Sequence, residues 1–338
     1  MQGVLVTAFE GPDALVVREL PEPEAQEGQV LIDVEWAGVV LPDILQTRGE
    51  YQTRPELPFV PGWEVSGTVR TDGAGFRAGD RVAALPVTGG FAQTVAVDAS
   101  MVFPLPDNVD TRRGAALPLN YLTAHFALIR RGALRPGEVV LVHGAAGGVG
   151  SAACQMAAAY GARVIAVVST DEKAEVARSV GVQEVVRVGG FLDAVRTLTD
   201  GRGVDLVVDP VGGDRFLDSL RALRHGVGRL LVLGFAGRGI PTVRVNRLLL
   251  TNTSVLGVGV DEYWRQDPEA ARAQWRELWP LLKSGRLDPP ISSVFPLEQA
   301  SDALGHLDER KASAGHCCRF VPDDASESSS TRGHQGGR

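Results

Sequence analysis

The sequence predicts an α/β protein that combines a β-rich domain with a doubly wound parallel sheet. Two patterns lead to this prediction. Residues 1–117 contain short alternating apolar runs separated by Gly and Pro, and from about residue 137 short buried strands alternate with Gly-rich turns and helices. A chain of 338 residues is long enough for two hydrophobic cores, and its 22% of charged residues is ordinary for a globular protein.

Four runs, each bounded by turn residues, indicate the β-rich part. They are Val30–Trp36, Glu64–Arg70, Asp80–Leu85 and Phe91–Val97. Turn dipeptides such as Pro61-Gly62 separate them, which favours a compact domain of short strands.

The second part repeats a strand, turn and helix unit. Val139–His143 has the length and apolarity of a buried strand, and the helix-favouring stretch Ser151–Tyr160 stops at Gly161, a residue typical of helix ends. Repeated units of this kind build a parallel sheet with helices on both faces. Further elements are expected at Arg163–Val168 (strand), Asp171–Val180 (helix), Val204–Gly212, Gly228–Gly234 and Ser254–Val260 (strands) and Pro268–Gly285 (helix).

Composition excludes several classes of function. A net charge of −7 argues against a nucleic-acid partner, which would require a basic face. No apolar run is long enough to span a membrane, and the first residues do not resemble a secretion signal. The three cysteines, Cys154, Cys317 and Cys318, suit neither a disulfide framework nor a four-cysteine zinc site. We therefore expect a cytoplasmic protein without a metal.

The turn between the first strand and helix of the second part predicts a dinucleotide site. Ala145–Gly150 fits the pattern A-x-G-x-x-G, with a strand before it and a helix after it. Gly147 lets the backbone approach a pyrophosphate, Gly150 lets the helix pack closely on its strand, and the helix N-terminus offers free N–H groups. We assign Ala146, Gly147, Gly148, Val149 and Gly150 to cofactor binding; the alternative is a doubly wound domain that binds no nucleotide.

The end of the second strand favours NADPH over NADH. An enzyme that binds NADH usually places an acid there for the ribose 2′-hydroxyl. Here Val168 is followed by Ser169 and Thr170, and Lys173 lies one helical turn further on. Ser169 and Lys173 are therefore expected to hold a 2′-phosphate. The neighbouring acids, residues 171 and 172, weaken this assignment, and Lys173 as a solvated surface charge is the alternative.

Several motifs in order resemble one known family. The segment Gly137–Gln155 closely resembles the cofactor segment of the zinc-free quinone oxidoreductase branch of the medium-chain dehydrogenase/reductase superfamily. The resemblance covers residues 1–320 and includes Leu57–Val69, Gly79–Val82, Leu119–Leu128, Val204–Gly213 and Gly228–Phe235. It implies a GroES-like catalytic domain at residues 1–117, a Rossmann NADPH-binding domain at 118–260, a return to the catalytic domain at 261–321, and, from its polar composition, a disordered tail at 322–338.

The resemblance also implies site residues. Tyr51, Asp43 and Asn120 are expected to face the nicotinamide pocket as the catalytic group. Thr123 joins them on the cofactor side, and Phe235, Gly257 and Val258 are expected to close the other side. Arg187 is expected to replace a tyrosine that the family uses near the 2′-phosphate, since Val188 stands at that position. Tyr51 as a packed loop aromatic and Asp43 as a structural acid are the alternatives. A homodimer paired along the strand at Ser254–Val260 is also implied.

Departures from the zinc enzymes of the same fold shape the predicted chemistry. Trp63 stands where those enzymes have a zinc-binding histidine, and Ala37–Asp43 lacks their zinc cysteine. Val40 also replaces an asparagine that is common in the zinc-free branch. Without a Lewis acid, an electron-poor acceptor that needs mainly positioning is favoured. We predict metal-free reduction of a quinone or α,β-unsaturated carbonyl by NADPH; an enoyl-thioester or tailoring reductase and a non-catalytic NADPH-binding protein are the alternatives.

Overall fold

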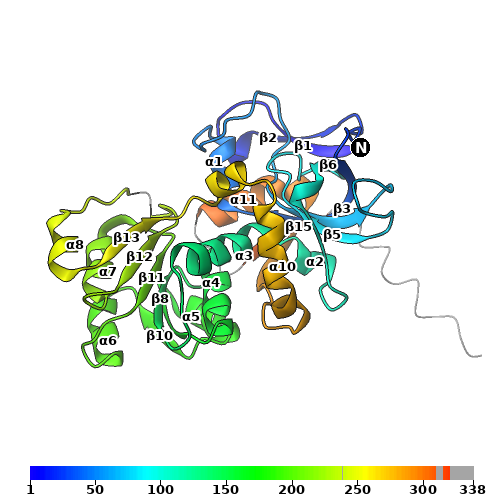
Figure 1. The fold of residues 1–338 in the computed structure, drawn as a ribbon. Coiled ribbons are helices and arrows are strands. Elements are labelled where there is room, and N and C mark those ends of the chain that lie inside the picture. The colour runs from blue at the N-terminus through cyan, green and yellow to red at the C-terminus, as the bar shows by residue number, and fades with distance from the viewer. Residues whose placement is uncertain (238, 310–314, 320–338) are drawn as a thin grey trace, which may run out of the picture.

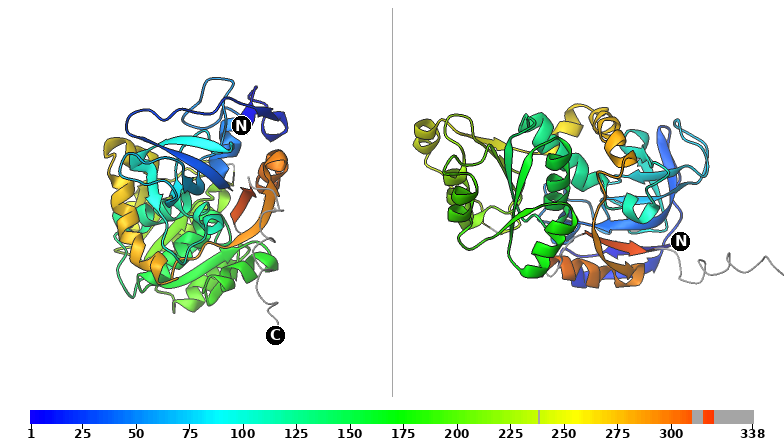
Figure 2. Two further views of the ribbon diagram at one scale, coloured as in Figure 1. Left: turned by 90° about the vertical axis from the view of Figure 1, so that its right-hand side faces the viewer. Right: turned by 90° about the horizontal axis from the view of Figure 1, so that it is seen from below.

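The computed structural model describes residues 1–237, 239–309 and 315–319, and it confirms the α/β class (Figure 1). One mainly β part holds the N-terminus, and a parallel sheet with its helices forms the other end of the molecule (Figures 1 and 2). The tail predicted at 322–338 lies outside the described residues. The predicted domain boundaries stay a prediction.

A six-stranded parallel sheet forms the centre of the second part. Its strands lie in the order β10-β9-β8-β11-β12-β13. From β8 the chain builds the sheet first toward β10 and then, from β11 on, toward the opposite edge, which is the doubly wound arrangement. The strands are β8 (Val139–His143), β9 (Arg163–Val168), β10 (Glu184–Arg187), β11 (Leu206–Asp209), β12 (Arg229–Val232) and β13 (Ser254–Gly257).

Helices cover both faces of this sheet because its strands alternate between two apolar cores. Val140 and Val142 of β8 pack into the core that contains α4 and α5, whereas Leu141 packs into the core that contains α6 and α7. The helices are α4 (Gly148–Ala159), α5 (Asp171–Ser179), α6 (Phe191–Leu198), α7 (Phe216–Ala222) and α8 (Asn246–Thr251). Three predicted strands are shorter than expected. β11 stops before Pro210, which lacks an N–H to donate, β12 ends at Val232, and β13 stops at Gly257, three residues before α9 begins.

The other large sheet has seven strands and draws on both ends of the chain. Its order is β14-β15-β3-β4-β5-β7, and β6 pairs with β3. Cys317 and Cys318 of β15 pair antiparallel with Gly38 and Ala37 of β3. The strands are β3 (Gln29–Val39), β4 (Val65–Val69), β5 (Arg81–Ala84), β6 (Thr94–Asp98), β7 (Val102–Pro104), β14 (Ile291–Pro296) and β15 (Gly315–Arg319); β1 (Gln2–Val6) and β2 (Leu15–Glu19) form a separate hairpin.

The remaining helices include two that pack on each other, α3 and α10. Residues 118–131 form α3 (Pro118–His125) and a π-helical turn (Phe126–Arg131), and α10 (Ala270–Lys283) packs on α3 and on β7. The others are α1 (Leu41–Thr47), α2 (Thr111–Gly114), α9 (Val260–Gln266) and α11 (Ala300–Asp308). Across the described residues, no helix has both the length and the apolarity needed to cross a bilayer.

Two buried carboxyl groups hold the backbone between β3 and α3. The carboxylate of Asp43 accepts hydrogen bonds from the backbone N–H of Val40 (2.9 Å) and of Trp63 (3.1 Å), which ties the start of α1 to the strand that follows. Glu64 accepts from the N–H of Leu119 (2.9 Å) at the start of α3. Burial is the largest influence on both groups and raises the pKa of Asp43 to about 7 and that of Glu64 to about 8.

These raised pKa values predict a loss of stability at alkaline pH. Both folded-state pKa values lie above those of the unfolded chain. At a pH between the unfolded-state and folded-state values, the folded protein therefore binds more protons than the unfolded chain. The associated stabilisation is complete below the unfolded pKa values and is lost as pH rises through about 7 and 8. Urea unfolding of the wild type should therefore give a lower free energy of unfolding at about pH 9 than at about pH 6.

The variant Glu64→Gln should show a shallower loss, since its amide oxygen still accepts from Leu119 but cannot ionise. The same substitution at the exposed Glu56 is the matched control. Wild-type and Glu64→Gln stabilities that fall in parallel would contradict a neutral buried Glu64.

Candidate functional site

The predicted glycine turn joins β8 to α4 at the edge where the strand order reverses. Gly147 is the residue that precedes α4, and no side chain caps the helix. The first N–H groups of a helix have no partner within it, so those of Gly148, Val149 and Gly150 are available to an anion. Ligands of doubly wound sheets bind beyond the carboxyl ends of the strands at this reversal. The turn therefore fits a pyrophosphate.

Two glycines of this turn lie in close contacts. A Cβ at Gly150 would lie 2.1 Å from the carbonyl oxygen of Gly144, so only glycine allows α4 to start against the end of β8. A Cβ at Gly148 would lie 2.5 Å from Oδ1 of Asn120 on α3. The structure thus brings the predicted Asn120 directly onto the turn. A cavity of about 10 Å³, enough for about one water, adjoins both residues and Ser151.

The predicted phosphate-binding groups gather beyond the ends of β9 and β10. Ser169 is exposed immediately after β9, and the hydroxyl of Thr170 accepts from the N–H of Lys173 (3.3 Å) at the start of α5. Nη1 of Arg187, the last residue of β10, lies 3.3 Å from the carboxylate of Asp171. Ser169, Lys173 and Arg187 therefore surround one helix start, where two cations and the helix dipole would meet a 2′-phosphate.

The acids at the same helix start oppose this role. Asp171 pairs with Arg187, and Glu172 follows it in the first turn of α5. The pKa of Glu172 is lowered, first by a hydrogen bond from the hydroxyl of Thr170 and to a lesser degree by Arg187 and Lys173. Both cations thus lie close to carboxylates, and a phosphate would have to compete with these for them.

Phe235, Gly257 and Val258 lie on the far side of the reversal point. Phe235 follows β12 and is 40% exposed, and a Cβ at Gly212 would lie 3.0 Å from its ring. Gly257 ends β13 and its carbonyl oxygen accepts from Nε of Arg131 (2.9 Å), while Val258 is buried. Thr123 is half-buried on α3, one helical turn after Asn120. Phe235, Gly257 and Val258 thus lie at or just after the carboxyl ends of β12 and β13, and the cofactor contacts expected of them and of Thr123 stay a prediction.

Tyr51 and Trp63 form an aromatic wall that comes from the N-terminal part. Their rings meet edge to face with centroids 5.1 Å apart. The hydroxyl of Tyr51 donates to Oδ2 of Asp261 over 2.5 Å, which joins the loop after α1 to the first turn of α9. Burial first, and then Asp261, hold the pKa of Tyr51 well above its usual value. Asp261 was not predicted, because it lies 210 residues from Tyr51 and no local motif marks it.

Asp43 lies behind this wall and is fully buried. Its two oxygens accept from backbone N–H groups, as described above, so the geometry favours the structural alternative over an acid that meets a ligand. His143 and His125 are also buried: Nε2 of His143 lies 2.8 Å from the hydroxyl of Ser219, and that of His125 lies 3.0 Å from the carboxylate of Glu277. Within the described ranges, no cluster of three or more His, Cys, Asp or Glu side chains could hold a metal ion.

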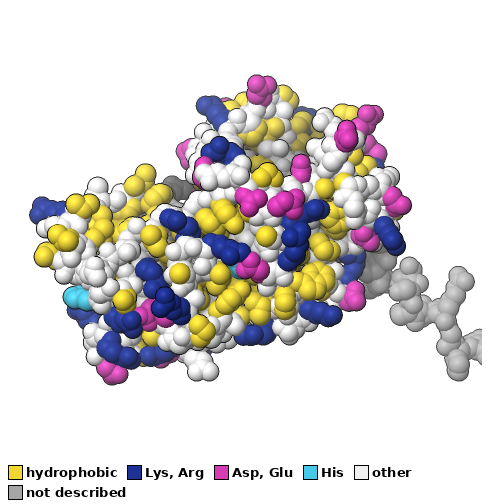
Figure 3. Space-filling model, viewed as in Figure 1, with side chains coloured by type: hydrophobic (Ala, Val, Ile, Leu, Met, Phe, Trp, Pro, Cys, Tyr) yellow, Lys and Arg dark blue, Asp and Glu magenta, His cyan; other side chains and the backbone are white. Residues whose placement is uncertain are grey.

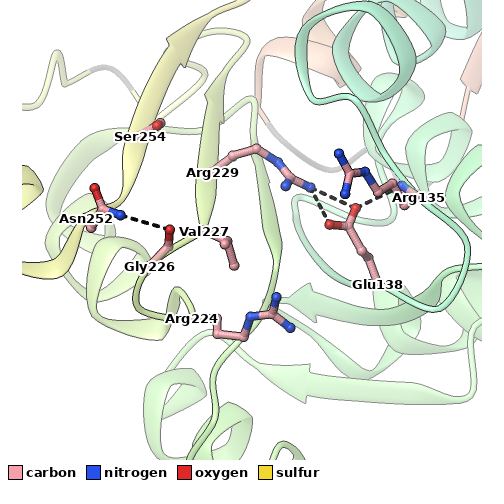
Figure 4. Close-up of a pocket in the computed structure, with 8 residues that line it drawn as sticks. All are labelled: Arg135, Glu138, Arg224, Gly226, Val227, Arg229, Asn252 and Ser254. Carbon is pink, nitrogen blue, oxygen red and sulfur yellow. Dashed lines mark hydrogen bonds and ion pairs between the residues drawn. The ribbon is translucent and has the colours of Figure 1, made fainter.

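A separate hollow lies at the opposite end of the parallel sheet from the glycine turn (Figure 4). It has a volume of about 340 Å³ and opens where β8, β12 and β13 begin. Arg229 donates to both oxygens of Glu138 (2.8 Å each), and Arg224 lies 2.9 Å from Asp205. The first pair joins the amino ends of β12 and β8, which flank β11, and Arg224 lies just past the C-terminus of α7, where a cation is stabilised. We assign this hollow a structural role.

Comparisons with known proteins agree with this architecture. The family described as alcohol dehydrogenase GroES-like domain matches residues 26–107, and the family described as zinc-binding dehydrogenase matches residues 148–284. The quinone oxidoreductase-like protein 2 of Bos taurus is 39% identical over 304 residues, which cover 88% of this chain and 87% of the bovine protein.

Solved structures extend the likeness to the whole described fold. A probable oxidoreductase from Mycobacterium abscessus has a TM-score of 0.87 at 40% identity, covering 95% of this chain and 99% of that one. The quinone oxidoreductase from Thermus thermophilus, solved also in complex with NADPH, has a TM-score of 0.84 at 36% identity and covers 95% and 100% of the two chains. The chain therefore belongs to the quinone oxidoreductase branch of the medium-chain dehydrogenase/reductase superfamily, with a GroES-like domain and a Rossmann domain.

Proposed function

We propose that this protein is an NADPH-dependent reductase that transfers hydride, without a metal, to a quinone or an α,β-unsaturated carbonyl. The glycine turn carries the proposal, because it presents free N–H groups at the reversal point of the sheet. In the GroES-like part, Trp63 stands in place of a zinc ligand. The relatives named above include a quinone oxidoreductase-like protein and the quinone oxidoreductase from Thermus thermophilus, and the latter is solved also in complex with NADPH.

The residues of the site divide into three tasks. The N–H groups of Gly148 to Gly150 would bind the pyrophosphate, and Ser169, Lys173 and Arg187 would bind the 2′-phosphate. Asn120, held against Gly148, would fix the nicotinamide side of the cleft. When bound, NADPH supplies the hydride from its nicotinamide ring.

The proton of the reduced acceptor is assigned to water. The hydroxyl of Tyr51 donates to Asp261, so its proton is directed at that carboxylate, and its pKa is raised well above the usual value. Both features make Tyr51 a poor general acid in this arrangement. A hydroquinone anion or an enolate, in contrast with a simple alkoxide, takes its proton from water readily.

Steady-state oxidation of NADPH against a panel of acceptors tests this function. Turnover is expected with 1,4-benzoquinone, with simple enones, or with both, and no change is expected when a chelator is added. Turnover confined to acyl thioesters would replace the proposal with an enoyl-thioester reductase. NADPH binding without turnover of any acceptor would indicate a non-catalytic NADPH-binding protein.

A second prediction concerns the choice of nicotinamide cofactor. Lys173→Ala should raise the KM for NADPH by about tenfold, the effect of about 1.4 kcal/mol, because a cation that meets the 2′-phosphate is removed. The KM for NADH should hardly change, since NADH carries no phosphate there. Lys283→Ala on α10 is the matched control, as it removes the same charge elsewhere. Equal effects on the two cofactors would refute the phosphate role of Lys173.

We also propose that two copies of the chain pair along β13. In the described part of the chain, β13 pairs with β12 on one side and with no strand on the other. Helix α8 precedes it at the outer end of the molecule (Figures 1 and 2), where apolar side chains gather on the surface (Figure 3). Its Leu249 and Leu250 are 80% and 78% exposed, and Val245 beside it is 75% exposed. An uncovered edge strand next to an exposed apolar patch favours pairing with a second copy.

Sedimentation velocity tests the pairing. The wild type should sediment at twice the mass of one chain, and the double variant Leu249→Asp with Leu250→Asp should sediment as a single chain, because two desolvated carboxylates oppose the contact. Val294→Asp on the exposed side of β14 is the control and should leave the mass unchanged. A wild type that stays monomeric across a wide concentration range would contradict the proposal.

A further inference from the structure

Trp63 is sealed from solvent although one of its polar atoms has no partner. The residue is 2% exposed, and its indole N–H is buried without a hydrogen-bond acceptor in the structure. Its backbone is fixed, because its own N–H donates to Asp43 and the next residue, Glu64, accepts from the start of α3. The ring of Tyr51, from the loop after α1, meets that of Trp63 edge to face. A buried N–H without an acceptor costs free energy. Other contacts must therefore keep the aromatic wall packed over the indole N–H of Trp63.

The hydrogen bond between Tyr51 and Asp261 is such a contact. Asp261 lies four residues after the end of β13, at the carboxyl edge of the sheet where the dinucleotide turn also opens. Its carboxylate accepts from the hydroxyl of Tyr51 over 2.5 Å, a length typical of a bond to a charged acceptor. Tyr51 is thus held by two contacts, the packing of its ring on Trp63 and the hydrogen bond of its hydroxyl to Asp261.

We propose that Asp261 is a positioning residue for acceptor selection: by holding the hydroxyl of Tyr51, it keeps the ring closed over Trp63 and so limits the size of the acceptor that the cleft admits. We call the Tyr51–Asp261 hydrogen bond the clamp. This inference rests on the proposed function for its acceptor. The clamp joins the GroES-like part to the segment that follows the Rossmann sheet, so its release would free the ring to change rotamer and would widen the cleft on the side of Trp63.

An acceptor-size series tests the clamp in the enzyme loaded with NADPH. Asp261→Ala and Tyr51→Phe should raise kcat/KM for 9,10-phenanthrenequinone relative to 1,4-benzoquinone by roughly tenfold, a typical effect of added space in a pocket. The KM for NADPH should stay unchanged. Asp261→Asn should keep the wild-type ratio, because its amide oxygen still accepts from Tyr51. Glu262→Ala, which removes an exposed carboxylate from the same helical turn, should also keep it.

A second measurement needs no turnover. Acrylamide quenching of tryptophan fluorescence is recorded for each variant with and without Trp63→Phe, and the difference isolates the signal of Trp63. Quenching of Trp63 should rise clearly in Asp261→Ala and Tyr51→Phe and stay at the wild-type level in Asp261→Asn and Glu262→Ala.

The two measurements separate the clamp from the proposed function. If no acceptor is turned over by any variant, the function fails while quenching still decides the clamp. An unchanged acceptor ratio in an active Asp261→Ala enzyme, or unchanged quenching of Trp63 in that variant, would overturn the clamp. Equal losses of kcat for all acceptors, together with lower thermal stability, would indicate a purely structural contact and would also overturn it.

Discussion

The close approach of α4 to the end of β8 is the constraint on which the rest of the site depends. Gly150 is needed because its α-carbon lies against the carbonyl oxygen of Gly144, and this contact places the helix N-terminus at the reversal point of the sheet. Asn120 can then rest on Gly148, which brings α3 to the turn. At the start of α3, the N–H of Leu119 donates to Glu64. This hydrogen bond couples the position of the turn to that of the GroES-like sheet.

Buried carboxyl groups make this connection between the turn and the GroES-like sheet rigid. Asp43 and Glu64 each bind a backbone N–H across a chain connection, and a neutral carboxyl tolerates burial far better than an ionised one. Trp63 lies between them in sequence, so its backbone is held in place. Tyr51, in contrast, belongs to a loop. The wall therefore combines one fixed aromatic ring with one whose position depends on a single partner, Asp261.

Local patterns predicted the fold and the glycine turn. The residues that determine a short strand, a glycine turn and the following helix lie within about twenty positions of one another. The strand Arg163–Val168 and the residues after it were predicted for the same reason. Contacts between distant segments were not predicted from the residues themselves. Asn120 and Tyr51 were named only through a family resemblance, and Asp261 was missed, because no pattern in a single sequence links positions 210 residues apart. The role of Asp43 also depended on which backbone groups the fold brings to it.

The composition of the wall bears on the kind of acceptor that suits this protein. Trp63 cannot act as a zinc ligand, and the hydroxyl of Tyr51 is engaged by Asp261 with a raised pKa. In the proposed reaction, this wall would therefore offer an acceptor neither a Lewis acid nor a ready proton donor. An unactivated ketone would develop an alkoxide with little stabilisation, which is costly in an apolar cleft. A quinone or an enone spreads the arriving charge over its own conjugated system, so the same wall has only to position it and exclude water.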